Sequence, residues 1–382
     1  MHFVRLQTSM FYGLLALIST GILLITGYLG NITHETYTML CPIQRVKTKS
    51  TGISDQNIYT KVYSITWIKR PNDTPKNLLT FKFRNCEFRN CKIGIASDET
   101  SLGKSDAVLF YHTSLDGKVP NKSSNQKWVF ISIESETYTN KTFLKKEWVN
   151  KFDWVFSYRP DADISFPYGE LARTKIQTEK NYKRIFVQKS KSVAWVVSHC
   201  TAVSKRNEYI QEMKKHIDVD VFGLCGKKCG SSPFNWNDDA CLKDLSKVYK
   251  FYLAFENTLC EDYVTEKAFR FYQDGFDILP VYRGAPNIRN ILPKGTFISS
   301  LDFQSPKELA LHLKHVGSNE SLYTSYLKAK DQFLSSSWSQ QEMLQSLHCS
   351  VCEKLNTGYE RSTKLNLPHW ILEKKCLIPT DI

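Results

Sequence analysis

The second half of the chain alternates apolar and amphipathic segments, and this order constrains the fold more than any other feature. The near-continuous apolar run 191–200 predicts a buried strand of a parallel sheet. In the following segment, 205–217, apolar residues recur at helical spacing. Further strands are predicted at 219–226, 251–257 and 277–284, and helices at 265–275 and 305–316. Ser305 and Glu308 have capping-box spacing. Strand, helix, strand in repeated order indicates a doubly wound parallel sheet, which binds ligands beyond the carboxyl ends of its strands.

The first half also reads as α/β, with short strand-like segments between polar turns. They lie at 62–68, 78–83, 106–112, 127–133 and 153–159, with a helix-compatible stretch between the last two. We therefore predict an N-terminal domain at 57–186, a C-terminal domain at 187–348 and a cysteine-containing segment at 349–382.

Residues 10–29 hold no charged side chain and are mostly apolar. Twenty helical residues span about 30 Å, the thickness of a bilayer core. Arg5 precedes the run, which favours a cytosolic N-terminus. The sequence thus predicts a cytoplasmic tail (1–9), a transmembrane signal-anchor (10–29) and a stem (30–56). A cleaved signal peptide is the alternative, but its apolar region is normally about 7–15 residues long.

Two features agree with a luminal body. N-glycosylation sequons follow the anchor at Asn31, Asn72, Asn121, Asn140 and Asn319. All eleven cysteines also follow it, and in an oxidising compartment up to ten of them can pair. The spacings in CGKKC (225–229) and CSVC (349–352) leave zinc binding as an alternative.

The formal charge of +13 predicts an anionic partner. Basic residues are interspersed with acids, and no glycine-rich nucleotide motif is present. Together with a luminal placement, this disfavours nucleic acid as the partner.

One lysine stands among four acids in FENTLCEDYVTEKAFRF, residues 255–271. A helix starting near Thr265 puts Lys267 in the first turn, where a bound phosphate makes a cation favourable. Glu256, Tyr263 and Glu266 can then meet sugar hydroxyls or a base edge. The alternative is a solvated helix start with an adjacent Glu–Lys pair.

This stretch resembles the signature of the α1,3/α1,4-fucosyltransferases, F-x-x-x-F-E-N-(S/T)…D-Y-(I/V)-T-E-K. The matching residues are Phe251, Phe255, Glu256, Asn257, Thr258, Asp262, Tyr263, Thr265, Glu266 and Lys267. IESE, FSYRPDADISFPYG, VAWVVSHC, LDFQSPKELALHL and the C-terminal C-x-x-C also have counterparts, in the same order. The likeness covers roughly residue 125 to the C-terminal region.

The resemblance implies an inverting transferase with two facing Rossmann-like domains (GT-B type). The single transmembrane helix and the sequons, predicted independently of the family, are what a glycosyltransferase of the Golgi membrane would show. The donor is GDP-fucose. The acceptor is the 3-hydroxyl of GlcNAc in a glycan or glycoprotein, either in a Lewis-type antenna or in the N-glycan core. No cofactor is required, although stimulation by Mn²⁺ and a homodimer are compatible with this expectation.

The resemblance also suggests residue roles. Glu134 is the expected catalytic base, although Glu136 is a second carboxylate at a position where the family usually has proline. Arg206, with Lys205 as its alternative, and Lys267 are expected to hold the diphosphate. The other expected donor contacts are Glu256, Asn257, Tyr263 and Glu266, although core packing is an alternative for Tyr263.

The resemblance places Arg159, Asp161 and Asp163 on the acceptor side or in a structural role, and the D-x-D triplet is not read as a metal site. Cys349 and Cys352 are candidates for disulfide bonding. Two other functions stay open: a GT-B transferase with a different nucleotide sugar, and a non-catalytic, membrane-tethered glycan-binding protein.

Overall fold

The computed structural model describes residues 61–69, 81–116, 118–174, 179–229, 239–336, 339–373 and 376–382. All of them belong to one compact unit, Tyr59–Ile382. The predicted anchor, the stem and the sequons at Asn31 and Asn72 lie outside the described residues. Within the described ranges, no helix is both long and apolar enough to cross a bilayer.

The first sheet has six parallel strands in the order β2-β1-β3-β4-β5-β6. Their bounds are β1 (Tyr63–Trp67), β2 (Cys91–Ile95), β3 (Ala107–Tyr111), β4 (Lys127–Ile131), β5 (Trp154–Ser157) and β6 (Ile164–Ser165). Side chains alternate between two buried faces, as period-two geometry requires. In β4, Val129 and Ile131 enter one apolar cluster, whereas Trp128 and Phe130 enter the other.

Strand prediction in this half succeeds at β1, β3, β4 and β5 and fails at residues 81–83, the described part of the predicted strand 78–83. The end of the predicted strand 78–83 is a 3₁₀ turn, η2 (Phe83–Asn85), and the strand of that region is β2. The other connections are short: α2 (Glu99–Gly103), η3 (His112–Ser114) and η4 (Lys141–Leu144). The stretch before β5 that was compatible with a helix thus contains the 3₁₀ turn η4 and no α-helix.

The second sheet has five parallel strands in the order β12-β11-β10-β8-β9. The strands are β8 (Lys191–Val196), β9 (Val219–Phe222), β10 (Tyr249–Phe255), β11 (Leu279–Arg283) and β12 (Ile298–Ser299). Helices α4 (Arg206–Lys214), α7 (Pro306–Ser318) and α8 (Glu320–Lys330) cover one face, with α3 (Tyr182–Gln188) beside α8. The other face packs against α5 (Asp239–Val248), α6 (Glu266–Phe269), η5 (Arg270–Tyr272) and η6 (Ile288–Asn290).

The cap of α7 forms as predicted on one side only. Ser305 Oγ accepts a hydrogen bond from Glu308 N at 3.3 Å. The Glu308 carboxylate accepts from Gln304 N at 2.9 Å instead of closing the reciprocal bond to Ser305. A short antiparallel ribbon, β7 (Leu171–Arg173) with β13 (Phe333–Ser335), accompanies the second sheet, and η7 (Ser300–Asp302) follows β12.

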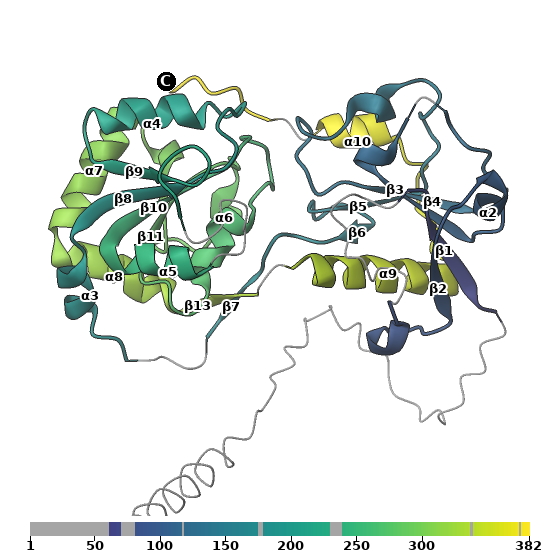
Figure 1. The fold of residues 1–382 in the computed structure, drawn as a ribbon, viewed down its shortest axis with the longest axis horizontal. Coiled ribbons are helices and arrows are strands. Elements are labelled where there is room, and N and C mark those ends of the chain that lie inside the picture. The colour runs from purple at the N-terminus through teal and green to yellow at the C-terminus, as the bar shows by residue number, and fades with distance from the viewer. Residues whose placement is uncertain are drawn as a thin grey trace, which may run out of the picture. The chain divides into compact units, whose positions relative to one another are not determined.

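After β13 the chain returns to the first sheet. Helix α9 (Gln340–Thr357) packs on one of its faces and α10 (Leu367–Glu373) on the other, as Figure 1 shows. The domain boundary expected at 348 therefore falls inside α9. The class α/β with parallel sheets is confirmed, whereas the transmembrane helix stays a prediction.

Cys349 and Cys352 do form disulfides, but not with each other. They pair with Cys86 and Cys91, beside the first sheet. Residues three apart lie on one face of a helix, so both thiols of α9 point toward the same sheet. This arrangement fixes α9 to a part of the chain that lies about 260 residues earlier.

The remaining described cysteines pair as Cys200–Cys225, Cys229–Cys241 and Cys260–Cys376. Because the sulfurs of CGKKC and CSVC are in disulfides, they are not thiolate ligands for zinc. The eleventh cysteine, Cys41, lies outside the described residues.

Candidate functional site

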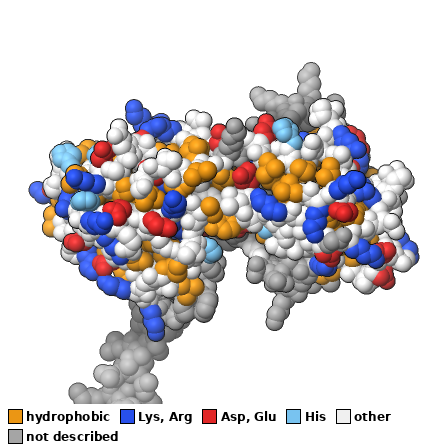
Figure 2. All heavy atoms as spheres, turned by 90° about the horizontal axis from the view of Figure 1, so that it is seen from above, with side chains coloured by type: hydrophobic (Ala, Val, Ile, Leu, Met, Phe, Trp, Pro, Cys, Tyr) orange, Lys and Arg blue, Asp and Glu red, His pale blue; other side chains and the backbone are white. Residues whose placement is uncertain are grey.

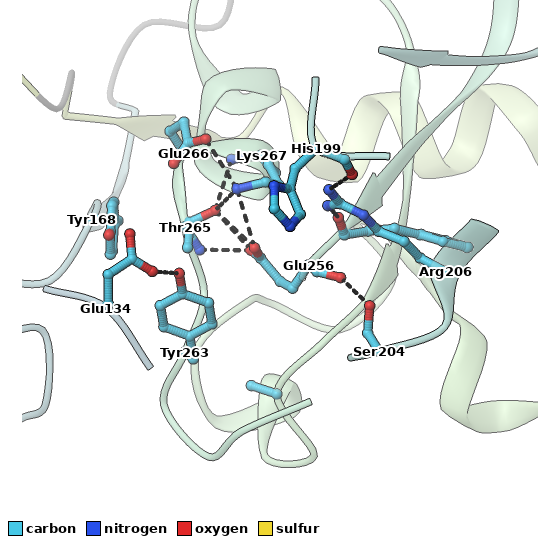
Figure 3. Close-up of polar contacts among 12 residues, drawn as sticks. Glu134, Tyr168, His199, Ser204, Arg206, Glu256, Tyr263, Thr265, Glu266 and Lys267 are labelled. Carbon is cyan, nitrogen blue, oxygen red and sulfur yellow. Dashed lines mark hydrogen bonds and ion pairs between the residues drawn. The ribbon is translucent and has the colours of Figure 1, made fainter. Parts of the chain in front are cut away.

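The acid-rich stretch forms a hydrogen-bonded cluster at the carboxyl end of β10. Glu256 follows the strand and is fully buried. Its carboxylate accepts hydrogen bonds from the backbone N and Oγ1 of Thr265, at 2.8 and 2.9 Å. Thr265 is in turn the N-cap of α6. Glu256 therefore fixes the start of this helix against the end of the strand (Figure 3).

Lys267 lies between two carboxylates. Its Nζ donates to Thr265 Oγ1 at 2.9 Å and to Glu266 Oε1 at 3.1 Å, and lies 3.4 Å from Glu256 Oε2. Burial alone would lower the pKa of Lys267, but the charges of Glu266 and Glu256 outweigh burial and hold the pKa above its ordinary value. The ammonium is thus a fixed positive charge, and 30% of the side chain is exposed.

The helix at this position is shorter than predicted. Regular α-helix covers only Glu266–Phe269, and Arg270–Tyr272 continues as a 3₁₀ turn. A single turn carries little of the macrodipole of a long helix. An anion at this site would therefore interact with the Lys267 side chain more than with a helix dipole.

Glu134 comes from the other sheet and joins the same cluster. It lies three residues after β4, and its Oε2 accepts a hydrogen bond from Tyr263 Oη at 3.0 Å. Burial raises the pKa of the Glu134 carboxyl, against the opposing effects of the Tyr263 hydrogen bond and the Lys267 charge. A carboxyl with a raised pKa is suited to act as a general base near neutral pH.

Tyr263 packs in the core and also forms a hydrogen bond to the expected catalytic residue. It is only 2% exposed and packs edge-on to Tyr158 and Tyr168, with ring centroids 5.0 and 6.2 Å away. Its hydroxyl nevertheless reaches the carboxylate of Glu134. Core packing and a place in the site, the two roles considered for Tyr263, are therefore compatible.

Arg206 begins α4 and is buried, with 3% of its surface exposed. Its Nη1 donates to the carbonyl of Phe255 at 2.8 Å and its Nη2 to that of His199 at 2.9 Å. Its Nε is buried without a hydrogen-bond partner among the described residues. Arg206 thus links the segments that follow β8 and β10 and places a buried positive charge next to them. Lys205, the alternative to Arg206, is exposed.

Asn257 lies beside Arg206 at the end of β10. Its carbonyl accepts from Ser204 N at 3.0 Å, and its side-chain Oδ1 is buried with no hydrogen-bond partner in the described part of the chain. The structure therefore gathers all six expected donor-side residues around the ends of β8 and β10.

Both acids of the D-x-D triplet form hydrogen bonds and ion pairs with residues beside the first sheet. Arg159 donates from Nε and Nη2 to Asp161, at 2.9 and 2.6 Å. Asp163 accepts from Val155 N at 2.8 Å and pairs with Arg361. Both carboxylates thus neutralise arginines of this domain, which supports a structural role for them.

The predicted helix start at Thr265 is confirmed, because Thr265 is the N-cap of α6, and its Oγ1 also accepts from Lys267. Two further residues of the cluster were not expected to take part in it: Tyr168 donates to the carbonyl of Ile133 at 2.8 Å, and His199 lies edge-on to Tyr138. Both lie inside motifs quoted above, but their contacts join distant parts of the chain and could not be read from the linear order.

The described sequons lie where glycans can attach. Asn121 and Asn319 are exposed and Asn140 is partly buried. Asn140 and Asn319 also cap η4 and α8 through their Oδ1 atoms. Their occupancy stays a prediction.

Comparison with known proteins identifies the family. Residues 59–169 match the model "Fucosyltransferase, N-terminal", and residues 186–370 match "Glycosyltransferase family 10 (fucosyltransferase) C-term". The chain therefore belongs to glycosyltransferase family 10, the fucosyltransferases, and the prediction of a fucosyltransferase-family enzyme is confirmed.

Curated relatives carry α1,3-fucosyltransferase names. The chain is 36% identical over 310 residues to glycoprotein 3-alpha-L-fucosyltransferase A of Drosophila melanogaster, covering 78% of this chain and 56% of that relative. It is 30% identical over 303 residues to human 4-galactosyl-N-acetylglucosaminide 3-alpha-L-fucosyltransferase 9, covering 76% and 78%. Among solved structures, an alpha1,3-fucosyltransferase with GDP is similar with a TM-score of 0.49 and 17% identity, covering 82% of this chain and 95% of that one.

Proposed function

We propose that this protein transfers L-fucose from GDP-fucose, with inversion, to the 3-hydroxyl of a GlcNAc residue in a glycan. Glu134 is the base, and Lys267 and Arg206 stabilise the diphosphate. We further propose that the enzyme works in the Golgi lumen, held by the N-terminal anchor as a single-pass type II membrane protein. The luminal sequons and the disulfides support this placement.

The observation that carries the proposal is the hydrogen bond from Tyr263 to Glu134. Tyr263 lies four residues before Lys267, and Glu134 belongs to the other sheet. The bond therefore brings a partly buried carboxylate and a fixed cation from the two sheets into one site. Sugar transfer needs both, a base for the incoming hydroxyl and a positive charge for the departing diphosphate.

The proposed step is a single displacement at C1 of fucose. The acceptor oxygen forms a bond to C1 while the bond from C1 to the diphosphate oxygen breaks, and GDP leaves with that electron pair. Glu134 takes the proton of the acceptor hydroxyl. Attack from the side opposite the leaving group inverts the configuration at C1.

The residues beside the diphosphate supply charge in two ways. Lys267 is partly exposed, so its ammonium can exchange a carboxylate contact for a phosphate oxygen. Arg206 is buried, and it contributes through its charge and its unpartnered Nε. These two cations make a required metal unnecessary in the proposed reaction, and stimulation by Mn²⁺ stays a prediction.

The acceptor is proposed only as a GlcNAc 3-hydroxyl. The Drosophila relative is named for glycoprotein acceptors and the human relative for 4-galactosyl-N-acetylglucosaminide. Both names describe fucose attachment to a 3-position, which is consistent with the proposal. They leave a lactosamine antenna and the N-glycan core as the two substrates to compare.

The test uses the secreted protein from residue 31 onward, incubated with GDP-fucose and each of the two acceptors. Glu134→Gln should lower transfer about 10²–10⁴-fold and leave GDP-fucose affinity unchanged. Lys267→Ala should weaken GDP-fucose binding as well. If the wild type binds other nucleotide sugars better than GDP-fucose, the donor assignment is wrong, and binding without any transfer would indicate a glycan-binding protein.

A further inference from the structure

His199 is an exposed residue at the edge of the donor-side cluster. It lies three residues after β8, and β8 runs parallel to β10, so His199 and Glu256 follow the carboxyl ends of neighbouring strands. In Figure 3 its imidazole lies between the side chains of Lys267 and Arg206. Burial raises the pKa of Glu134, and the charges of Lys267 and His199 both oppose this rise. The imidazole is therefore close to the proposed base and to both cations of the site.

The backbone at His199 is fixed by the residues around it. Its carbonyl accepts a hydrogen bond from Arg206 Nη2 at 2.9 Å. The next residue, Cys200, forms a disulfide with Cys225, which follows β9. Val197 N, two residues before His199, donates to the carbonyl of the last residue of β9 at 2.9 Å. The segment is thus tied to α4 and to β9, and ligand binding by a side chain on a fixed backbone costs less conformational entropy.

The imidazole ring contacts a tyrosine ring but forms no hydrogen bond. Tyr138 lies edge-on to it, with the ring centroids 5.9 Å apart and an interplanar angle of 88°. Neither ring nitrogen has a hydrogen-bond partner among the described residues. Because His199 is exposed, water or a ligand can reach these nitrogens. An imidazole has at least one N–H donor in either protonation state, so His199 offers an unused donor to the site.

The two cations of the site are already engaged by protein groups. Lys267 Nζ lies 3.1 Å from Glu266 Oε1 and 3.4 Å from Glu256 Oε2. Both Nη atoms of Arg206 donate to backbone carbonyls. The diphosphate of a nucleotide sugar carries negative charge on several oxygens, and it gains one more charge when the sugar leaves. A further donor at this position would therefore bind oxygens that the two cations leave without a partner.

Building on the proposed function, we propose that His199 binds the diphosphate of GDP-fucose through a hydrogen bond from its imidazole to a phosphate oxygen. Lys267 and Arg206 supply fixed positive charge, and His199 supplies an exposed N–H that no described protein group uses. The hydrogen bond is charge-assisted, because its acceptor is an anion. It strengthens as the departing diphosphate gains charge, so His199 contributes both to donor binding and to transfer.

The place of His199 in the fold separates it from the base. His199 follows a strand of the second sheet, as Glu256 does, whereas Glu134 follows β4 of the first sheet. A side chain among the donor-side residues is placed to contact the leaving group. Its loss should therefore weaken the binding of GDP itself, a step in which no proton is transferred to a base.

The test compares the full-length enzyme with His199→Phe and His199→Gln, and with His315→Phe as a matched control. Phenylalanine keeps a ring that can pack on Tyr138 but has no donor, whereas glutamine keeps an N–H donor without the ring. His315 is an exposed histidine in the last turn of α7. The readouts are the Kd values of GDP-fucose, GDP and guanosine, and kcat with a lactosamine or core N-glycan acceptor. Thermal unfolding checks that each variant is folded.

His199→Phe should weaken the binding of GDP-fucose and GDP about 10–100-fold, the range expected for the loss of a hydrogen bond to a charged group. Guanosine lacks the diphosphate, so its Kd should not change. His199→Gln should bind GDP-fucose more tightly than His199→Phe, because its amide can donate to the same oxygens. His315→Phe should match the wild type in every readout.

Two results would overturn the inference, while fucose transfer by the wild type would leave the proposed function intact. An unchanged Kd for GDP-fucose and GDP in His199→Phe would show that the imidazole does not contact the diphosphate, even if kcat falls. Equal losses of affinity for guanosine and GDP would show that His199 shapes the nucleoside pocket instead. A wild type that neither binds GDP-fucose nor transfers fucose would remove the proposed function and this inference with it.

Discussion

The C-terminal tail holds a buried arginine of the second sheet, and removing its carboxylate should destabilise the protein. Arg283 ends β11 and is fully buried. Its Nη1 and Nη2 donate to the two carboxylate oxygens of Asp381 at 2.5 and 2.8 Å, and its guanidinium lies 4.3 Å from the ring centroid of Tyr209. Asp381→Asn keeps the shape of the side chain but leaves the arginine charge without its counter-ion.

The magnitude follows from the burial of the two partners. Removing one partner of a buried ion pair costs about 3–5 kcal/mol. Asp381 is 22% exposed, so water can partly replace it, and we expect about 2–3 kcal/mol. For a protein of this size that corresponds to a fall in Tm of roughly 4–8 °C.

The assay is thermal unfolding at a fixed scan rate, with Asp274→Asn as the control. Asp274 is an exposed acid of the same domain and should change the stability by less than about 0.5 kcal/mol. GDP-fucose affinity should also fall in Asp381→Asn, because the carbonyl of Arg283 accepts from Glu256 N at 2.8 Å and so supports the donor site.

A Tm for Asp381→Asn within 1 °C or so of the wild type would refute this reasoning. The double variant Arg283→Met with Asp381→Leu offers a second check. Replacing a buried ion pair with apolar residues of similar volume is often close to neutral, so this variant should be more stable than Asp381→Asn alone.

Three other predictions test the site and its frame. kcat/KM should fall as the pH is lowered through the raised pKa of Glu134, because the protonated carboxyl cannot take a proton. Tyr263→Phe removes a hydrogen bond that lowers this pKa, so the acidic limb of the pH profile should move to higher pH. Thr265→Ala should cost about 2–3 kcal/mol, since it loses a helix cap and hydrogen bonds to the carboxylate that follows β10, and Thr265→Ser should retain most of the stability in the same unfolding assay. The paired change Cys91→Ser with Cys352→Ser should lower the Tm by the equivalent of about 2–5 kcal/mol, and an unchanged Tm would show that α9 does not need this link.

The strands of both sheets were predictable where hydrophobic runs are local. The run 191–200 contains β8, and FYLAFEN contains most of β10, because a strand buried on both faces must be apolar throughout. The segment 78–83 misled through a different pattern, the alternation of apolar and polar residues. Phe81 and Phe83 are apolar at period two, yet their rings pack edge-on to each other at a 3₁₀ turn.

What the sequence could not predict is the return of the chain to the first sheet. Nothing in the local pattern of residues 340–373 says which sheet the two helices cover. Cys349 and Cys352 have the spacing of a metal or redox motif, and only the distant partners Cys86 and Cys91 reveal their structural role. Disulfide partners depend on the tertiary fold, so the spacing of cysteines leaves them open.

This difference explains why the donor side was easier to read than the acceptor side. The proposed donor residues Glu256, Tyr263, Glu266 and Lys267 lie within twelve residues of one another, so their motif can be recognised in the sequence itself. On the other side, Arg159, expected on the acceptor side or in a structural role, donates to the carbonyl of Trp370, 211 residues later in the chain. Because Trp370 of α10 holds Arg159, exchanging α10 between family members should change the acceptor KM without changing donor affinity if Arg159 lies on the acceptor side, and an unchanged acceptor KM would assign Arg159 a structural role.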